Sequence, residues 1–300
     1  MNSIKKIVPV FFLVLVYSCG DTNTPYKISD SKYIVDDLGN NFSIEKTYER
    51  IVSLAPNLTE MVFELKAGEL LVGNTTYCNY PPEADSVSKV GDLLSINYEK
   101  IVELNPDLIL ITVEGNSKNS YEKLKNLGFD VFVSNPRDYQ GIKKSFKDIA
   151  SIFHKDTLAE TIIEHWDKKI SKIEEAANST SIKDALFVIS VNPIMTAGTS
   201  TFVNEYLKFC GIKNAAEESQ VNYPVFSREE ILLINPSLIV TSVHDNLFLK
   251  DVLELYPEWK ELYAIKNNAV VYVDVDLYFR PGPRFVIALS ELSEKLRILN

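Results

Sequence analysis

The chain has 300 residues, of which 46% are hydrophobic and 24% are charged, a composition typical of a folded globular protein rather than a disordered one. Its formal net charge of −10 at pH 7 argues against nucleic acid as a partner, because phosphate binding requires a basic surface. The same charge does not exclude a partner protein with a basic surface.

The N-terminus carries a pattern typical of an export signal. Lys5 and Lys6 precede an apolar run over residues 7–17, which is too short to cross a bilayer but fits the core of a signal peptide. Residues 16–19, Val-Tyr-Ser-Cys, resemble a bacterial lipobox, which implies cleavage before Cys19 and lipid attachment to its sulfur. A plain secretory signal with an incidental cysteine is the alternative. We predict a signal peptide over residues 1–18 and a polar, lipidated tether over residues 19–31.

Short apolar strands alternate with helices over residues 32–153, which we predict to be an N-terminal lobe. A hairpin is expected over residues 33–44, with its turn at Gly39 and Asn40. The expected strands cover residues 51–55, 71–73, 108–113 and 130–133, and longer helices cover residues 59–65, 121–127 and 139–153. This alternation predicts a parallel sheet with right-handed crossovers.

One stretch of this lobe recurs 130 residues later. Residues 99–110 and 229–240 share six of twelve amino acids, which indicates two similar lobes. Each copy reads as a capped helix, an Asn-Pro end and a buried strand. The caps are expected at Asn97 and at Ser227, the latter in a capping box with Glu230. Glu99 and Glu229 therefore lie in the first helical turn without being needed as caps.

A long helix is expected between the two copies. Apolar residues recur at steps of three and four from Leu158 to Ala177, and no proline or glycine interrupts residues 155–178. We predict a linking helix over residues 154–180 and a C-terminal lobe over residues 181–300. The predicted fold class is α/β, with two Rossmann-like lobes of parallel sheets, one connecting helix and a ligand cleft between the lobes. Cys78 and Cys210 fall in different lobes, so we expect both thiols to be free.

No pattern of catalytic or metal-binding residues is present in the sequence. The three histidines lack metal-ligand spacing, and we find neither a glycine-rich phosphate loop nor a nucleophile elbow. This favours a binding protein over an enzyme, with no cofactor and no metal. The expected strand ends instead carry aromatic and apolar residues with a few polar ones, as in a cleft for a large, partly apolar ligand. Ordinary core packing is the alternative for each of these residues.

The order and spacing of several segments resemble the type III periplasmic substrate-binding proteins, and among them the cobalamin-binding proteins. These segments cover residues 50–56 (Arg-Ile-Val-Ser-Leu-Ala-Pro), 72–82, 98–108, 192–198, 227–229 and 276–284. The resemblance implies an extracytoplasmic lipoprotein, attached to a bacterial membrane only by its lipid, that captures cobalamin or a related corrinoid. It also implies that the protein acts as a monomer and delivers the ligand to the transmembrane subunits of an ABC importer.

The resemblance implies roles for particular residues. Five of them fall where cobalamin-binding relatives contact the corrinoid: Tyr77, Met195, Tyr223, Asp276 and Arg280. Two more fall where some of those relatives carry tryptophan: Leu93 and Thr112. Glu99 and Glu229 match glutamates that dock onto arginines of the importer, and favourable placement at a helix N-terminus is their alternative role. Cys210 matches a family cysteine whose partner would fall near Ser293.

The sequence leaves other ligands open. Haem fits the same scaffold, with Tyr77 or Tyr223 as the axial ligand. So does a ferric siderophore, which would be held by cations such as Arg137, Arg280 and Arg284. A surface enzyme or an adhesion module of the same fold is a further hypothesis. Turnover of a substrate would indicate the enzyme, and tight stoichiometric binding without turnover would exclude it.

Overall fold

The computed structural model describes residues 32–93, 95–178, 180–242 and 245–299, and residues 32–300 form one compact unit. The predicted signal peptide, the tether and Cys19 lie outside the described residues. The N-terminal hairpin is confirmed: β1 (Tyr33–Val35) pairs antiparallel with β2 (Asn41–Ser43). No helix among the described residues is long and apolar enough to cross a membrane.

The first sheet is parallel throughout, as predicted. Its strands are β3 (Ile51–Ser53), β4 (Leu71–Asn74), β5 (Leu108–Thr112) and β6 (Val131–Ser134), in the order β4-β3-β5-β6. The helices that alternate with them are α1 (Pro56–Glu64), α2 (Tyr98–Leu104), α3 (Lys118–Asn126) and α4 (Tyr139–Ile152). Strands β3, β5 and β6 are buried along their whole length, because helices pack on both faces of a parallel sheet.

The second sheet contains β7 (Asp184–Val191), β8 (Ile194–Thr196), β9 (Lys213–Asn214), β10 (Val225–Phe226), β11 (Leu238–Thr241) and β12 (Val270–Tyr272). Strand β11 runs parallel to β7 and β12, as expected. One edge departs from the parallel pattern, since β8 is antiparallel to β7 and β10 is antiparallel to β8. The reason is local: β7 turns directly into β8 at Asn192 and Pro193, and so short a connection allows only antiparallel pairing.

The helices of this lobe are α6 (Phe202–Phe209), α7 (Arg228–Ile234), α8 (Asp245–Leu255), α9 (Tyr263–Lys266), α10 (Val275–Tyr278) and α11 (Phe285–Leu299). Helix α10 is a single short turn that follows β12. Asp274 caps it by accepting a hydrogen bond from the backbone N–H of Leu277.

The two copies of the repeat fold alike, as α2 followed by β5 and as α7 followed by β11. Asn97 and Ser227 cap these helices, and Ser227 forms the predicted capping box with Glu230. Asn105 and Asn235 end the helices in the left-handed conformation, with φ of 46° and 43°. The helices therefore stop at an asparagine cap that tolerates positive φ, in addition to the effect of the following proline.

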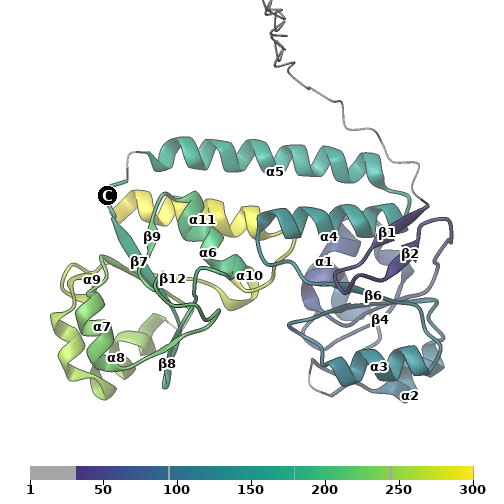
Figure 1. Cartoon of the computed structure of the whole chain (residues 1–300), viewed down its shortest axis with the longest axis horizontal. Helices are drawn as coiled ribbons and strands as arrows, with labels where there is room; N and C mark the ends of the chain where they lie inside the picture. The colour runs from purple at the N-terminus through teal and green to yellow at the C-terminus, as the bar shows by residue number, and fades with distance from the viewer. Residues whose placement is uncertain (1–31, 94, 179, 243–244, 300) are drawn as a thin grey trace, which may run out of the picture. The chain divides into compact units, whose positions relative to one another are not determined.

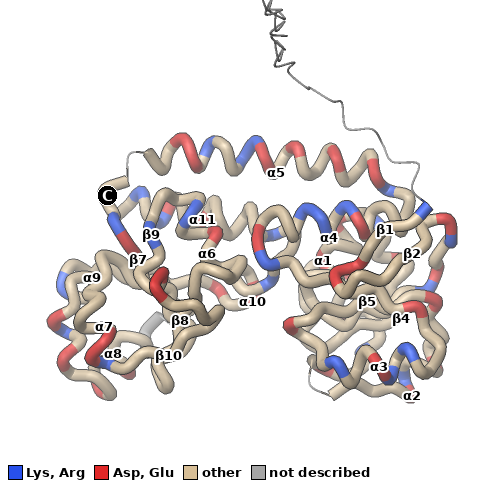
Figure 2. The backbone as a smooth tube through the Cα atoms, viewed as in Figure 1, with Lys and Arg blue, Asp and Glu red and all other residues tan. Residues whose placement is uncertain are grey.

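Helix α5 (Asp156–Ala177) runs along α4 and α11 (Figure 1). Trp166, Ile170 and Ile173 are buried as the apolar periodicity predicts, and so are Ala159 and Ile163. Leu158 and Ile162 are half-buried, and Ile162 packs against the core. Acidic residues occupy the first half and the end of α5, and lysines lie between them (Figure 2). The largest buried apolar cluster includes residues of both sheets and of α5, so the two lobes share a continuous core.

Candidate functional site

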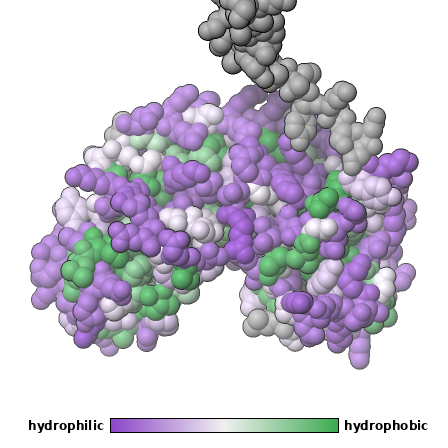
Figure 3. Space-filling view, in the orientation of Figure 1, coloured by the Kyte–Doolittle hydropathy of each residue, from purple (hydrophilic) through white to green (hydrophobic). Residues whose placement is uncertain are grey.

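A cavity of about 260 Å³ lies where the first lobe meets residues 275–281. Its walls come from the carboxyl ends of β3, β5 and β6, from the loop after β4 and from the segment around α10, which matches the rule that ligands bind beyond the carboxyl ends of parallel strands. The surface is hollowed between the two sides of the molecule (Figure 3). Five of the seven predicted ligand-binding residues line this cavity: Tyr77, Leu93, Thr112, Asp276 and Arg280.

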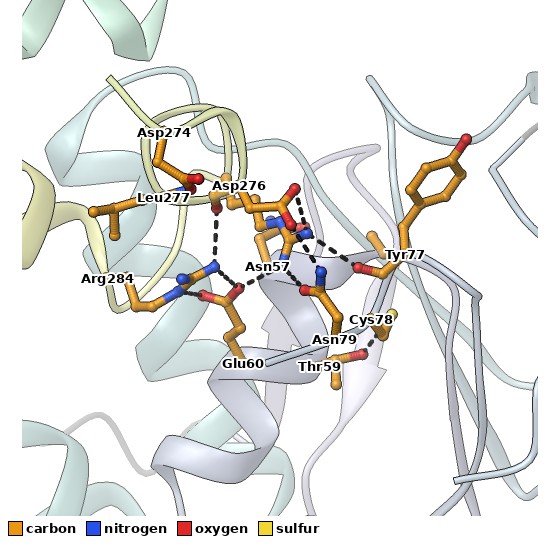
Figure 4. A network of polar contacts seen from close by, with 12 residues as sticks. Asn57, Thr59, Glu60, Tyr77, Cys78, Asn79, Asp274, Asp276, Leu277 and Arg284 are labelled. Atoms are coloured by element: carbon orange, nitrogen blue, oxygen red, sulfur yellow. Dashed lines mark hydrogen bonds and ion pairs between the residues drawn. The ribbon is translucent and has the colours of Figure 1, made fainter. Parts of the chain in front are cut away.

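Tyr77 presents its ring to solvent at this cavity. The residue is 52% exposed, and its ring points away from the polar contacts behind it (Figure 4). Its backbone carbonyl faces those contacts and accepts a hydrogen bond from Arg280 Nη2 at 3.1 Å. The ring is therefore free for a ligand while the main chain beneath it is held.

Arg280 lines the cavity but is almost fully buried, and its guanidinium is fully engaged. Its guanidinium pairs with Asp276 at 2.7 Å and with Glu60 at 3.2 Å, and it donates to Asn79 Oδ1 at 2.8 Å. Asp276 thus pairs with Arg280, and it also accepts a hydrogen bond from Asn79 Nδ2 at 2.8 Å. Asp276 remains 45% exposed, so it can still meet a ligand.

The sequence reasoning missed Glu60. This residue lies on α1 between buried Thr59 and Met61, and its side chain is 1% exposed. Arg284 binds both of its carboxylate oxygens, through Nε at 2.9 Å and Nη2 at 2.6 Å (Figure 4). The sequence carried no clear signal, because the same helix also contains Asn57, Thr59 and a second acidic residue, Glu64, which is exposed.

Met195 and Tyr223 do not line this cavity. Met195 is half-buried on β8, where it pairs with Val225 of β10. Burial and the nearby Glu114 carboxylate raise the pKa of Tyr223 to about 12, against the opposing effect of Arg137. Tyr223 is thus within electrostatic reach of Glu114, which does line the cavity, whereas the structure gives no such link for Met195.

Each arginine near the cavity is already paired. Arg137 forms an ion pair with Glu114 at 3.2 Å, and Arg280 and Arg284 share Glu60. The carboxylates of Asp276 and Glu114 line the cavity and are the partners of Arg280 and Arg137, so these charges balance. Within the described residues no group of three or more histidine, cysteine or acidic side chains could hold a metal ion.

The two repeat glutamates occupy equivalent places but differ in their surroundings. Glu99 is exposed in the first turn of α2 and forms no ion pair within the described part of the chain. Glu229 is exposed in the first turn of α7, where Arg228 Nε binds it at 2.9 Å. A backbone hydrogen bond and this contact hold the pKa of Glu229 below its usual range. Neither glutamate is the cap of its helix.

Both described cysteines are buried free thiols, as expected. Burial raises the pKa of the Cys210 thiol to about 12, so it is unreactive near neutral pH. Cys210 and Ser293 line the same small cavity of about 130 Å³. The serine thus lies beside Cys210, where the family resemblance would place a second cysteine.

Comparison with known proteins identifies the family. Residues 51–277 match the model of the periplasmic binding protein family. The chain is 32% identical over 297 residues to an uncharacterized ABC transporter substrate-binding lipoprotein of Bacillus subtilis, and the match covers 94% of this chain and 93% of that protein.

Two solved structures give the same result. The periplasmic vitamin B12-binding protein BtuF of Vibrio cholerae matches with a TM-score of 0.72 and 28% identity, covering 84% of this chain and 98% of that one. A possible iron-binding periplasmic solute-binding protein of Staphylococcus epidermidis matches with a TM-score of 0.75 and 26% identity, covering 84% and 99%. The chain therefore belongs to the periplasmic binding protein family, as a non-enzymatic substrate-binding protein of an ABC transporter that acts outside the cytoplasm.

Proposed function

We propose that this protein captures cobalamin or a related corrinoid in the cavity beside Tyr77 and delivers it to its importer. The observation that carries the proposal is the charge balance at the cavity: Asp276 and Glu114 line the wall and pair with Arg280 and with nearby Arg137, so neither arginine is left unpaired. An anionic ferric chelate would need several free cations, which the described wall residues do not supply. The amide groups around a corrinoid are neutral and donate hydrogen bonds, so they suit carboxylate acceptors, and the exposed ring of Tyr77 suits the apolar face of the macrocycle.

Haem is the second candidate because of one observation. The Tyr77 phenol is half-exposed at the cavity, and a tyrosine oxygen can serve as an axial ligand of haem iron. Haem also carries propionates, which the paired arginines would bind weakly. A tyrosinate-ligated haem would give a charge-transfer absorption band that disappears in Tyr77→Phe.

Calorimetric titration of the purified protein with cyanocobalamin, haemin and a ferric catecholate siderophore tests the ligand. We expect saturable, one-to-one binding of cyanocobalamin without chemical change. Asp276→Asn should weaken this binding, whereas Asp251→Asn, on the remote helix α8, should not. Tight binding of haemin or the siderophore with no heat from cyanocobalamin would overturn the corrinoid assignment.

Delivery is proposed to use Glu99 and Glu229 as one docking contact per lobe, read by basic residues of the importer's membrane subunits. Opposite charges steer such encounters and fix their register. The double charge reversal Glu99→Arg and Glu229→Arg should abolish uptake while cyanocobalamin affinity stays unchanged. The matched control Glu103→Arg and Glu261→Arg changes the net charge equally at other exposed sites. Loss of affinity in the first variant would place these residues in the ligand site instead.

The lobes are proposed to span residues 32–153 and 181–300, with residues 154–180 as the connection, and the protein is proposed to act as a monomer. Because the lobes share a core and α5 packs along α4 and α11, closure on the ligand should be small. Membrane attachment is proposed to be through lipid on Cys19. Metabolic labelling with a fatty acid should mark the wild-type chain and not Cys19→Ala.

A further inference from the structure

Glu60 is a buried carboxylate close to the cavity but absent from its wall. It lies on α1, with a side chain 1% exposed, among apolar residues such as Leu58 and Met61. A carboxylate in such a place is tolerated only when it is paired and hydrogen-bonded. Its partners, Arg280 and Arg284, come from the other end of the chain.

The pairing is complete and electrically balanced. Glu60 accepts hydrogen bonds from Arg284 Nε and Nη2 at 2.9 and 2.6 Å, and from Arg280 Nη1 at 3.2 Å. Asp276 supplies the second negative charge, at 2.7 Å from Arg280. Two carboxylates therefore neutralise two guanidinium groups, and the Tyr80 ring lies 4.1 Å from the guanidinium carbon of Arg284.

The same arginines hold groups at the cavity. Arg280 binds the Tyr77 carbonyl and the Asn79 side chain, and Asn79 in turn binds Asp276. Arg284 also donates to the Asp276 carbonyl at 2.9 Å. Tyr77, in the loop after β4, and Asp276, in α10, lie almost 200 residues apart in the sequence and are thus held in one network that depends on Glu60 (Figure 4).

We propose that Glu60 is a positioning residue of the ligand site: it anchors Arg280 and Arg284, and through them sets Tyr77 and Asp276 in place. It also leaves the cavity wall without unpaired positive charge, which excludes anionic ligands. The inference rests on the proposed function for its ligand, but the positioning of Tyr77 can be measured without any ligand.

The first test compares Glu60→Gln with Glu205→Gln. Glu205 is a matched control, because it is buried, pairs with Lys208 at 3.0 Å and accepts from the backbone N–H of Tyr139, yet it does not line the cavity. In Glu60→Gln we expect cyanocobalamin affinity to fall about tenfold, since a buried ion pair loses one partner. In Glu205→Gln the affinity should stay within about twofold of wild type. This should hold even if the melting temperature of Glu205→Gln falls as much as that of Glu60→Gln.

The second test reports on position 77 directly. The chain has two tryptophans, Trp166 and Trp259, and both are buried, so Tyr77→Trp adds one exposed fluorophore. Time-resolved fluorescence anisotropy then gives the local mobility of the introduced indole. The signal of Trp166 and Trp259 is subtracted by measuring the same protein without the Tyr77→Trp substitution. Adding Glu60→Gln should add a nanosecond component to this decay, and adding Glu205→Gln should not. If Glu60→Gln does not fold, Arg284→Lys serves instead, because it keeps the charge but loses the two-point contact.

The outcomes separate the two proposals. Unchanged affinity in folded Glu60→Gln overturns the positioning role, and so does lost affinity with unchanged anisotropy of the introduced indole. Should wild type bind no cyanocobalamin, the proposed ligand is wrong, and the anisotropy alone decides the role of Glu60. Gain of haemin or siderophore binding in Glu60→Gln, with the introduced indole mobilised, supports the role of Glu60 in excluding anionic ligands.

Discussion

Replacing Tyr77 by alanine should weaken ligand binding without destabilising the fold. The residue is 52% exposed, and a tyrosine offers about 200 Å² in all, so about 100 Å² of ring is available to a ligand. At about 25 cal/mol per Å² this area contributes about 2.5 kcal/mol, or about 70-fold in affinity. This is an upper value, because a bound ligand covers only part of the ring. The carbonyl that Arg280 holds is unchanged in the variant.

The assay is calorimetric titration with cyanocobalamin, paired with thermal unfolding of the same samples. Tyr263→Ala is the control, because Tyr263 is 54% exposed on α9 and does not line the cavity. We expect Tyr263→Ala to bind as wild type does, and both variants to melt close to the wild-type temperature. Wild-type affinity in Tyr77→Ala would refute the reasoning, since the exposed ring would then not contact the ligand.

Three further predictions concern the fold. Ser293→Cys should form a disulfide with Cys210, since both positions line one cavity, and raise the free energy of unfolding by about 3 kcal/mol. If the thiols of Cys210 and of the introduced cysteine both remain titratable after oxidation, this prediction is wrong. Asn105→Ala and Asn235→Ala should each cost about 1 kcal/mol in urea unfolding because alanine disfavours positive φ, whereas glycine at either position should cost less. Burial raises the pKa of Tyr223 from 10.0 to about 12, so its contribution to stability is present below pH 10 and lost as pH rises through 12. Tyr223→Phe should therefore lose less stability than wild type between these pH values.

Much of the scaffold could be predicted from local patterns. The strand and helix alternation predicted two α/β lobes, and the uninterrupted apolar periodicity predicted the helix that the structure shows as α5 (Asp156–Ala177). The repeat predicted the capped helices and buried strands of α2, β5, α7 and β11, because caps, turns and burial depend on nearby residues. The antiparallel edge of the second sheet was not expected, since strand direction depends on how the connecting turn folds.

The site was predicted only in part. Tyr77, Leu93, Thr112, Asp276 and Arg280 line the cavity, and their contact with a ligand stays a prediction. Met195 and Tyr223 do not line it, because their places depend on how one lobe faces the other. The sequence suggested two equivalent glutamates, yet Arg228 pairs with Glu229 while the corresponding position before Glu99 is a tyrosine.

The sequence by itself determined which segments form helices and strands, that the two halves are alike, and that no catalytic pattern is present. Only the tertiary structure decided the partners of the charges. Glu60 meets Arg280 and Arg284 across separations of 220 and 224 residues, and no local pattern relates residues so far apart. The physical reason is that burial makes a charge costly without specifying its partner, and the partner is fixed only when the packed lobes bring opposite charges together.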